Sequence, residues 1–173
     1  MKKRTAWALA TFIAIIVGAN LLTASFGLVT LLGLTATAGT WVAGLAFVAR
    51  DSLQESGGAR WVVVAIVVGA ALSAFASPTL ALASAVAFAF SEAADWAVYT
   101  PLRRKHRTTA ALLSNTVGSI LDTLIFLSLA GFPLAGAPTQ VVVKVATTSL
   151  VVMGVRLAIS RQPVHAAGGG RHA

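Results

Sequence analysis

The sequence predicts an all-α membrane protein: a bundle of six transmembrane helices with both termini in the cytoplasm. Of its 173 residues, 57% are hydrophobic and 10% are charged, and the mean hydropathy is +0.85. A soluble domain carries about 25% charged residues, so this chain has too few to cover a water-facing surface. We therefore expect one membrane-embedded domain at residues 1–161 and a disordered cytoplasmic tail at residues 162–173.

Apolar segments of about 20 residues, the length that crosses a bilayer, follow one another along the chain. They run near 6–25, 36–53, 60–77, 79–101, 109–131 and 138–160. The breaks between them carry glycine, proline or charged residues and fall at 33–39, 56–58, 77–78, 103–107 and 133–138. The alternation of a membrane β-barrel is missing, so helices are the remaining way to satisfy the backbone in lipid.

The basic residues orient these segments. They precede the first segment, lie in every second connection and follow the last segment, whereas the connections near 26–35, 77–79 and 132–137 carry no charge. Cytoplasmic loops are enriched in lysine and arginine, so both termini are expected in the cytoplasm of a multi-pass protein of the cell (inner or plasma) membrane. Lys144 alone departs from this pattern. A cleaved signal peptide is the alternative for the first segment, but its removal would invert the charge bias of the later loops.

Several classes of function are disfavoured by composition. The net charge of +8 does not indicate nucleic-acid binding, because the basic residues cluster in connections and not along one helix face. Cysteine is absent, and the three histidines lack metal-ligand spacing. No phosphate-binding G-x-x-x-x-G-K-[ST] loop occurs. We expect no enzyme activity, no metal and no cofactor, and any dependence on ATP would require another subunit.

The few acids are the most informative residues. A carboxylate or a lysine at a helix centre costs about 2.5–3.5 kcal/mol, so Glu92, Asp95, Asp122 and Lys144 require partners, which predicts an interior polar site. A structural ion pair between Asp122 and Lys144 is the simpler alternative. Helical spacing gives five segments one polar stripe each. The stripes are Asn20 and Thr23; Thr40, Gly44, Phe47, Asp51 and Gln54; Glu92, Asp95 and Tyr99; Asn115, Ser119, Asp122 and Phe126; and Gln140, Lys144 and Thr148.

Glu92 and Asp95 lie one helical turn apart, and two such carboxylates in a low dielectric should not both ionise without a cation. The pair therefore suits a proton or a cationic substrate. Trp96 and Tyr99 beside them either pack or stack on a flat ligand, and packing is the better explanation for each.

Other polar and small residues have structural explanations. Asp51 and Glu55 either belong to the site or form interfacial pairs with Arg50 and Arg60. A single serine or threonine in a span is more often structural, because it bonds back to its own helix or packs against another. Small residues repeat at every fourth position of the first segment, and contact within the bundle is favoured over contact with a partner. These are Ala10, Ala14 and Gly18.

Short motifs occur in a fixed order along nearly the whole chain. They are Asn20; Gly33-Leu34 and Ala38-Gly39-Thr40; Phe47-Val48-Ala49-Arg50-Asp51 with Gln54-Glu55; Ser91-Glu92-Ala93-Ala94-Asp95; Pro101-Leu102-Arg103-Arg104; Ser114-Asn115; Ser119-Ile120-Leu121-Asp122-Thr123-Leu124-Ile125-Phe126; and Lys144. In this order the chain resembles the queuosine precursor transporters, also called vitamin-uptake-transporter-like proteins. The Ser-x-x-Asp-Thr core is the most specific motif. Members of that family often carry glutamine at the position of Glu92, and this chain is short for the family.

The resemblance implies uptake of a 7-deazaguanine, such as 7-cyano-7-deazaguanine or 7-aminomethyl-7-deazaguanine, for tRNA modification. Carboxylates would accept hydrogen bonds from the base, aromatic rings would stack on it, and Lys144 would balance the acids. The expected substrate-binding residues are Glu92, Asp95, Asp122, Asn115, Ser119, Lys144, Asn20, Asp51, Tyr99 and Phe126.

The partners expected on this basis are a small heterocyclic substrate and the lipid bilayer, together with a homo-oligomeric partner or an energising ATPase module as candidates, and no nucleic acid. Proton coupling and facilitated diffusion with metabolic trapping both fit the residues. Two other functions remain open: a substrate-binding subunit of an energy-coupling-factor vitamin transporter, and a membrane scaffold protein that transports nothing.

Overall fold

The structure is a computed structural model that describes the backbone of residues 2–102 and 107–160. Side chains are described in these ranges except at 107–112, 115, 155, 156 and 158–160. The predicted tail at 162–173 and most of the basic run at 103–107 lie outside the described residues. The helices are α1 (Lys3–Phe26), α2 (Thr40–Gly57), α3 (Ala59–Ser73), α4 (Pro78–Leu102), α5 (Arg107–Ala130) and α6 (Ala137–Ser160), with a short 3-10 turn, η1 (Leu134–Gly136), before α6.

The six helices agree with the six predicted segments to within four residues at each end, and the structure differs in kind at the start of the second segment. There the chain forms an antiparallel hairpin of β1 (Leu28–Leu31) and β2 (Leu34–Thr37), so the predicted start of a helix at residue 36 is wrong. The two residues of the turn, Leu32 and Gly33, have φ of +54° and +77°. Two left-handed residues are typical of the tight turns that join twisted strands. β-Branched residues on both strands, including Thr30 and Thr35, whose hydroxyls lie 2.7 Å apart, favour the extended chain.

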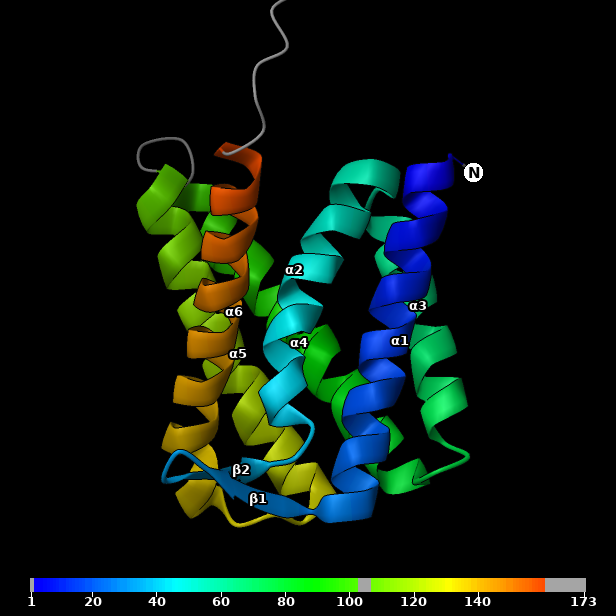
Figure 1. The fold of residues 1–173 in the computed structure, drawn as a ribbon, viewed down its shortest axis with the longest axis vertical. Coiled ribbons are helices and arrows are strands. Elements are labelled where there is room, and N and C mark those ends of the chain that lie inside the picture. The colour runs from blue at the N-terminus through cyan, green and yellow to red at the C-terminus, as the bar shows by residue number, and fades with distance from the viewer. Residues whose placement is uncertain (1, 103–106, 161–173) are drawn as a thin grey trace, which may run out of the picture.

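The helices form a ring in which each contacts the next, in the order α1, α2, α6, α5, α4, α3 and back to α1. Figure 1 shows the ring from the side, with the hairpin at one end and the N-terminus at the other. α2 and α4 are not neighbours in this ring. Glycine permits close approach at Gly44 of α2, where a Cβ would lie 2.9 Å from the carbonyl oxygen of Lys144 in α6. The Thr148 hydroxyl donates to the Gly44 carbonyl at 3.0 Å across the same contact.

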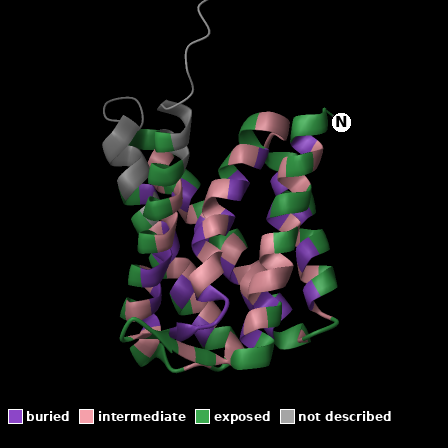
Figure 2. Ribbon diagram, viewed as in Figure 1, coloured by how far each residue is buried: buried purple, intermediate pink, exposed green. Residues whose placement is uncertain are grey.

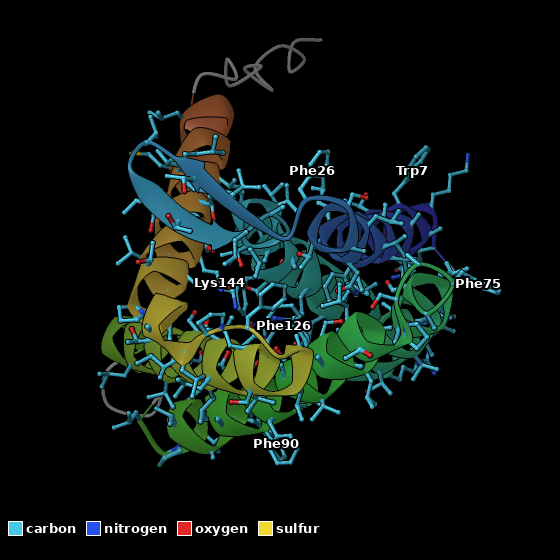
Figure 3. All side chains as sticks on the ribbon, turned by 90° about the horizontal axis from the view of Figure 1, so that it is seen from below. Trp7, Phe26, Phe75, Phe90, Phe126 and Lys144 are labelled. Carbon is cyan, nitrogen blue, oxygen red and sulfur yellow. The ribbon has the colours of Figure 1, made fainter. Side chains whose placement is uncertain are left out.

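The distribution of apolar residues is typical of a protein in lipid. A buried cluster that includes Phe12, Leu53 and Val62 joins α1, α2 and α3. Exposed residues occur along the helices of the ring (Figure 2), and many of them are large and apolar. Trp7 and Phe75, which are 76% and 91% exposed, point away from the ring (Figure 3). Polar side chains are buried instead. They include Asn20, Thr40, Arg50, Gln140 and Lys144.

Three helical segments in the described residues are long and apolar enough to cross a membrane: Lys3–Phe26, Pro78–Leu102 and Leu134–Gly154. Ala59–Ser73 and Thr116–Ala130 are apolar but shorter. Together with the outward apolar faces, these helices make the chain a helical membrane protein. α2 is the least apolar helix because its last three turns carry Arg50, Asp51 and Glu55.

Candidate functional site

A cavity of about 90 Å³ lies inside the ring, toward the hairpin end. All six helices and β2 contribute to its wall. Its polar and aromatic lining residues are Asn20, Thr23, Thr37, Thr40, Phe47, Ser84, Phe88, Asp122, Phe126 and Lys144. Figure 3 looks into the ring from the hairpin end, where Phe126 and Lys144 lie near the centre. We call this space the inner cavity.

An ion pair forms one wall of the inner cavity. Lys144 Nζ of α6 donates to Asp122 Oδ2 of α5 at 2.5 Å and to the Thr123 hydroxyl at 3.0 Å. The two charged side chains are 4% and 14% exposed. The predicted alternative of a pair that ties two helices together is therefore realised, and Asp122 also faces the cavity. The pair balances its own charge, so this wall offers a donor and an acceptor at little net charge.

Asn20 connects three helices beside the same cavity. Its side-chain amide donates to the hydroxyls of Ser73 in α3 and Ser84 in α4, each at 3.0 Å. The Ser84 hydroxyl in turn donates to the carbonyl of Ala81 in its own helix, as predicted for serines in spans. Both amide hydrogens of Asn20 are thus used in holding α1 against α3 and α4.

A buried network ties the hairpin to α6. The hydroxyls of Thr37 and Thr40 lie 2.7 Å apart, and both donate to Gln140 Oε1, at 3.3 and 2.7 Å. Gln140 is 1% exposed, and its Nε2 has no hydrogen-bond partner among the described residues. Thr37 and Thr40 also line the inner cavity, so this network sets its wall at the hairpin end.

Arg50 gathers three carboxylates at the other end of the inner cavity. Its Nη1 lies 2.5 Å from Glu92 Oε1, its Nε 2.9 Å from Asp51 Oδ1, and its Nη2 3.4 Å from Asp95 Oδ2. Arg50 is buried, whereas Asp51 is 61% exposed at the rim. We call these four residues the Arg50 cluster. It joins α2 to α4 across the ring through side chains.

A second cavity of about 400 Å³ opens beside the Arg50 cluster, toward the N-terminal end of the ring. Its lining residues are Arg50, Asp51, Gln54, Glu55, Asp95, Tyr99 and Ser114. We call it the N-terminal cavity. Gly118 of α5 faces the same carboxylate, because a Cβ there would lie 2.5 Å from Asp95 Oδ1. α5 therefore packs tightly against the Asp95 side chain of α4.

The structure divides the predicted site into two parts. Four of the predicted residues line the inner cavity and three line the N-terminal cavity. The first set is Asn20, Asp122, Phe126 and Lys144, and the second is Asp51, Asp95 and Tyr99. Glu92 contacts Arg50 and lines neither cavity, and Ser119 is buried in α5 without lining either. The Asn115 side chain lies outside the described residues. Glu92, Asp95 and Asp122 do not converge on one point, as a single binding site would require.

Arg50 is the main residue that sequence reasoning missed, because its position near a basic loop assigned it to topology. α2 continues for two turns beyond Arg50, so its side chain lies inside the ring. The spacing of Phe47, Arg50 and Gln54 at i, i+3 and i+7 was the signal that could have placed it on the inner face.

The predictions that assigned structural roles to residues near the site are confirmed in part. Arg50 does pair with Asp51, whereas Arg60 lies over the Trp61 ring at 5.9 Å, and Glu55 forms no ion pair within the described residues. Trp96 is 76% exposed and lines neither cavity, so the predicted packing of this side chain is wrong, and it does not stack on a ligand inside the ring either.

The predicted packing of the small residues of α1 within the bundle is wrong. Ala10 and Ala14 are exposed, and a Cβ on Gly18 would meet nothing within 4 Å in the structure.

Comparison with known proteins identifies a family. The model of a family described as "putative vitamin uptake transporter" matches residues 74–164, which hold α4, α5 and α6. The matched region includes Glu92, Asp95, Asp122 and Lys144 and spans more than half of the chain. No curated protein and no solved structure matches the chain. With the apolar helices and the buried polar cavity, this match makes the chain a member of the vitamin uptake transporter family.

Proposed function

We propose that the protein imports a queuosine precursor, a 7-deazaguanine such as 7-cyano-7-deazaguanine or 7-aminomethyl-7-deazaguanine, through the inner cavity. The observation that carries the proposal is the composition of that cavity. It combines one carboxylate, one ammonium group and aromatic rings inside a ring of membrane helices. The sequence motifs that resemble queuosine precursor transporters agree with it.

The chemistry of the cavity matches a flat, donor-rich base. Asp122 would accept hydrogen bonds from the ring N–H and the exocyclic amine of a deazaguanine, and Lys144 would donate to its carbonyl oxygen. Phe126, stacked on Phe132 at 6.2 Å, offers a face for the ring. The Lys144–Asp122 pair would loosen as the substrate takes over its hydrogen bonds, and Thr123 would retain Lys144.

The cavity must widen to hold such a substrate. Sites for small molecules have volumes of roughly 300–1,000 Å³, against about 90 Å³ here. The state described is therefore a narrow one, and the transport cycle would open it by moving helices of the ring. We propose a six-span protein of the cell membrane with both termini cytoplasmic, which places the N-terminal cavity on the cytoplasmic side.

Growth and tRNA content test the substrate. In a cell that lacks both deazaguanine synthesis and its own transporter, the chain should restore queuosine in tRNA at low external precursor. Asp122→Asn should abolish the rescue, because an amide cannot replace the carboxylate that holds Lys144 and the base. Ser128→Ala, at an exposed serine whose hydroxyl bonds back to its own helix, is the matched control and should rescue fully. Absence of rescue with every deazaguanine, despite normal membrane expression, would refute the substrate assignment.

One observation favours a second candidate, the substrate-binding subunit of an energy-coupling-factor transporter. The stripe of Ala10, Ala14 and Gly18 faces outward with open space above it, as close contact with a partner helix requires. Co-purification of an ATPase module, lost on Ala14→Leu, would favour this candidate. If neutral replacements of Asp95 and Asp122 left uptake unchanged, a non-transporting scaffold would be the better description.

A further inference from the structure

One layer of side chains separates the two cavities. Phe47 of α2 and Phe88 of α4 stack with ring centroids 6.3 Å apart and line the inner cavity. Arg50 lies about one turn beyond Phe47, and Glu92 and Asp95 lie about one and two turns beyond Phe88. Of the Arg50 cluster, Arg50 and Asp95 line the N-terminal cavity. Since α2 and α4 are not neighbours in the ring, these side chains close the space between them.

Within the described part of the chain, the charges in this layer do not balance. One guanidinium faces three carboxylates, those of Asp51, Glu92 and Asp95. Among the described residues, the other ionisable groups that line the N-terminal cavity are Glu55 of α2 and Tyr99 of α4, neither of which is a cation, and the lining residue of α5, Ser114, is uncharged. Lys144 cannot compensate, because it is paired with Asp122.

Asp95 makes the longest contact with Arg50 of the three carboxylates. Its Oδ2 accepts a hydrogen bond from Arg50 Nη2 at 3.4 Å, and its Oδ1 is buried without a hydrogen-bond partner among the described residues. Glu92 Oε1 also lacks a hydrogen bond there, but it lies 2.5 Å from Arg50 Nη1. A buried carboxylate with an unsatisfied oxygen is costly, and adding a proton removes the cost of its charge. Asp95 also borders the N-terminal cavity, from which water can deliver that proton.

We propose that Asp95 is the binding site for a coupling proton, and that protonation weakens its contact with Arg50 and opens the layer between the two cavities. A hydronium ion in the N-terminal cavity transfers its proton to Asp95. An O–H bond forms on the carboxylate, and a water molecule remains in the cavity. Arg50 then keeps Glu92 and Asp51, and α2 is less strongly tied to α4. This proposal deepens the transport function above and rests on it.

A proton fits the site better than a sodium ion. A sodium ion needs several oxygen ligands, and in many transporters backbone carbonyls freed where a helix unwinds supply some of them. In this chain α2 and α4 are continuous through the Arg50 cluster and free no such carbonyls. A proton requires one carboxylate oxygen alone, and Asp95 Oδ1 provides it.

The test uses the absence of cysteine from the chain. Because of it, all labelling of a variant by a thiol reagent comes from the single cysteine that was introduced. Ala43→Cys places a thiol in the inner cavity, beyond Phe47 as seen from the N-terminal end. Gln54→Cys places one in the N-terminal cavity as the reference. Both variants are labelled with a membrane-impermeant maleimide in sealed vesicles. The vesicles are those in which the N-terminal cavity faces the medium, as shown by reaction of the Gln54→Cys protein. The measured quantity is the rate at Ala43→Cys divided by the rate at Gln54→Cys, which corrects for the effect of pH on the reagent.

The rate ratio should rise when the medium is changed from mildly alkaline to mildly acidic. Asp95→Asn, which imitates the protonated carboxyl group, should raise the ratio about tenfold in alkaline medium, within the range typical of coupled sites, and remove its dependence on pH. Glu92→Gln, a second variant in case the first folds poorly, should raise the ratio but keep its response to pH through Asp95. Glu55→Gln is the matched control. Glu55 lines the same cavity but has no described ion pair with Arg50, so this variant should give the same ratio and the same response to pH as the unmodified protein.

An unchanged ratio in Asp95→Asn, or an Asp95→Asn ratio that still follows pH, would overturn the proposal. A ratio that follows sodium concentration and not pH would overturn it in favour of a sodium site. The assay contains no substrate, so a wrong substrate assignment would appear as failed rescue of tRNA queuosine while the labelling ratio still responds to pH.

Discussion

Two buried cations, Arg50 and Lys144, define the polar interior of the described residues. Lys144 faces one carboxylate and a hydroxyl, so its charge is matched locally. Arg50 faces three carboxylates, so its surroundings hold more negative charge than it can balance. A matched pair suits a neutral substrate, and an unmatched cluster suits an exchangeable proton. We propose that the two cations support different steps of one transport cycle.

Removal of one partner from the matched pair should cost more than removal of both. Lys144→Met should lower the free energy of unfolding by about 3 kcal/mol or more, because it leaves the Asp122 carboxylate buried without a counter-ion. The double variant Lys144→Met with Asp122→Asn should recover much of this loss. Thermal unfolding of the purified protein in detergent measures both. A double variant less stable than Lys144→Met would contradict the ion-pair interpretation.

At the scale of the elements, close packing decides where the polar groups lie. The contact of α4 with α5 brings Gly118 against the Asp95 carboxylate, and the contact of α2 with α6 brings Gly44 against the backbone of Lys144. The hairpin closes one end of the inner cavity through Thr37, which Gln140 holds. Helix faces thus supply the residues, and small side chains set how near the faces approach.

A matched pair of glycine variants tests this packing. Gly118→Ala should destabilise the protein by roughly 1–3 kcal/mol, because its Cβ would overlap Asp95 Oδ1, and should also disturb the Arg50 cluster. Gly18→Ala, with open space around its Cβ, should stabilise α1 by about 0.5–1 kcal/mol, the usual gain from alanine in a helix. Unfolding midpoints of the two variants check the difference. Equal midpoints would show that α4 and α5 pack less tightly than described.

At the scale of the whole molecule, exposed aromatic residues mark both ends of the ring. Trp7 and Trp96 lie near the N-terminal end, and Phe26 and Phe75 near the hairpin end. From Trp7 to Phe26 the rise along α1 is about 28 Å, close to the roughly 30 Å thickness of the hydrocarbon core. Aromatic residues concentrate at membrane interfaces, so these positions match a ring that spans the bilayer along its length.

This arrangement predicts the membrane topology. Reporter domains fused at either terminus should lie in the cytoplasm, whereas reporters inserted at Gly33 in the hairpin or at Ser77 between α3 and α4 should lie outside. The reason is that Lys2, Lys3, Arg4 and Arg60, among the described residues, lie at the starts of α1 and α3, at the end of the ring opposite the hairpin. Paired phosphatase and fluorescent-protein fusions report the two sides. A cytoplasmic reporter at Gly33 would overturn the six-span topology.

The sequence by itself determined the helical membrane class and the approximate bounds of six helices, and it singled out the intramembrane charges as residues that need partners. These depend on composition, on 3.6-residue periodicity and on the cost of charge in lipid, all of which act locally along the chain. It did not place the hairpin, because ten residues with a tight turn carry a weak signal beside long apolar segments.

Only the tertiary structure decided which charges meet. Asp122 pairs with Lys144, 22 positions away, and Asp95 lies by Arg50, 45 positions away, because the order of the helices in the ring brings these faces together. Spacing along one helix shows which residues share a face but cannot show which other helix that face meets. For this reason the single polar site expected from the sequence became two cavities separated by the Arg50 cluster.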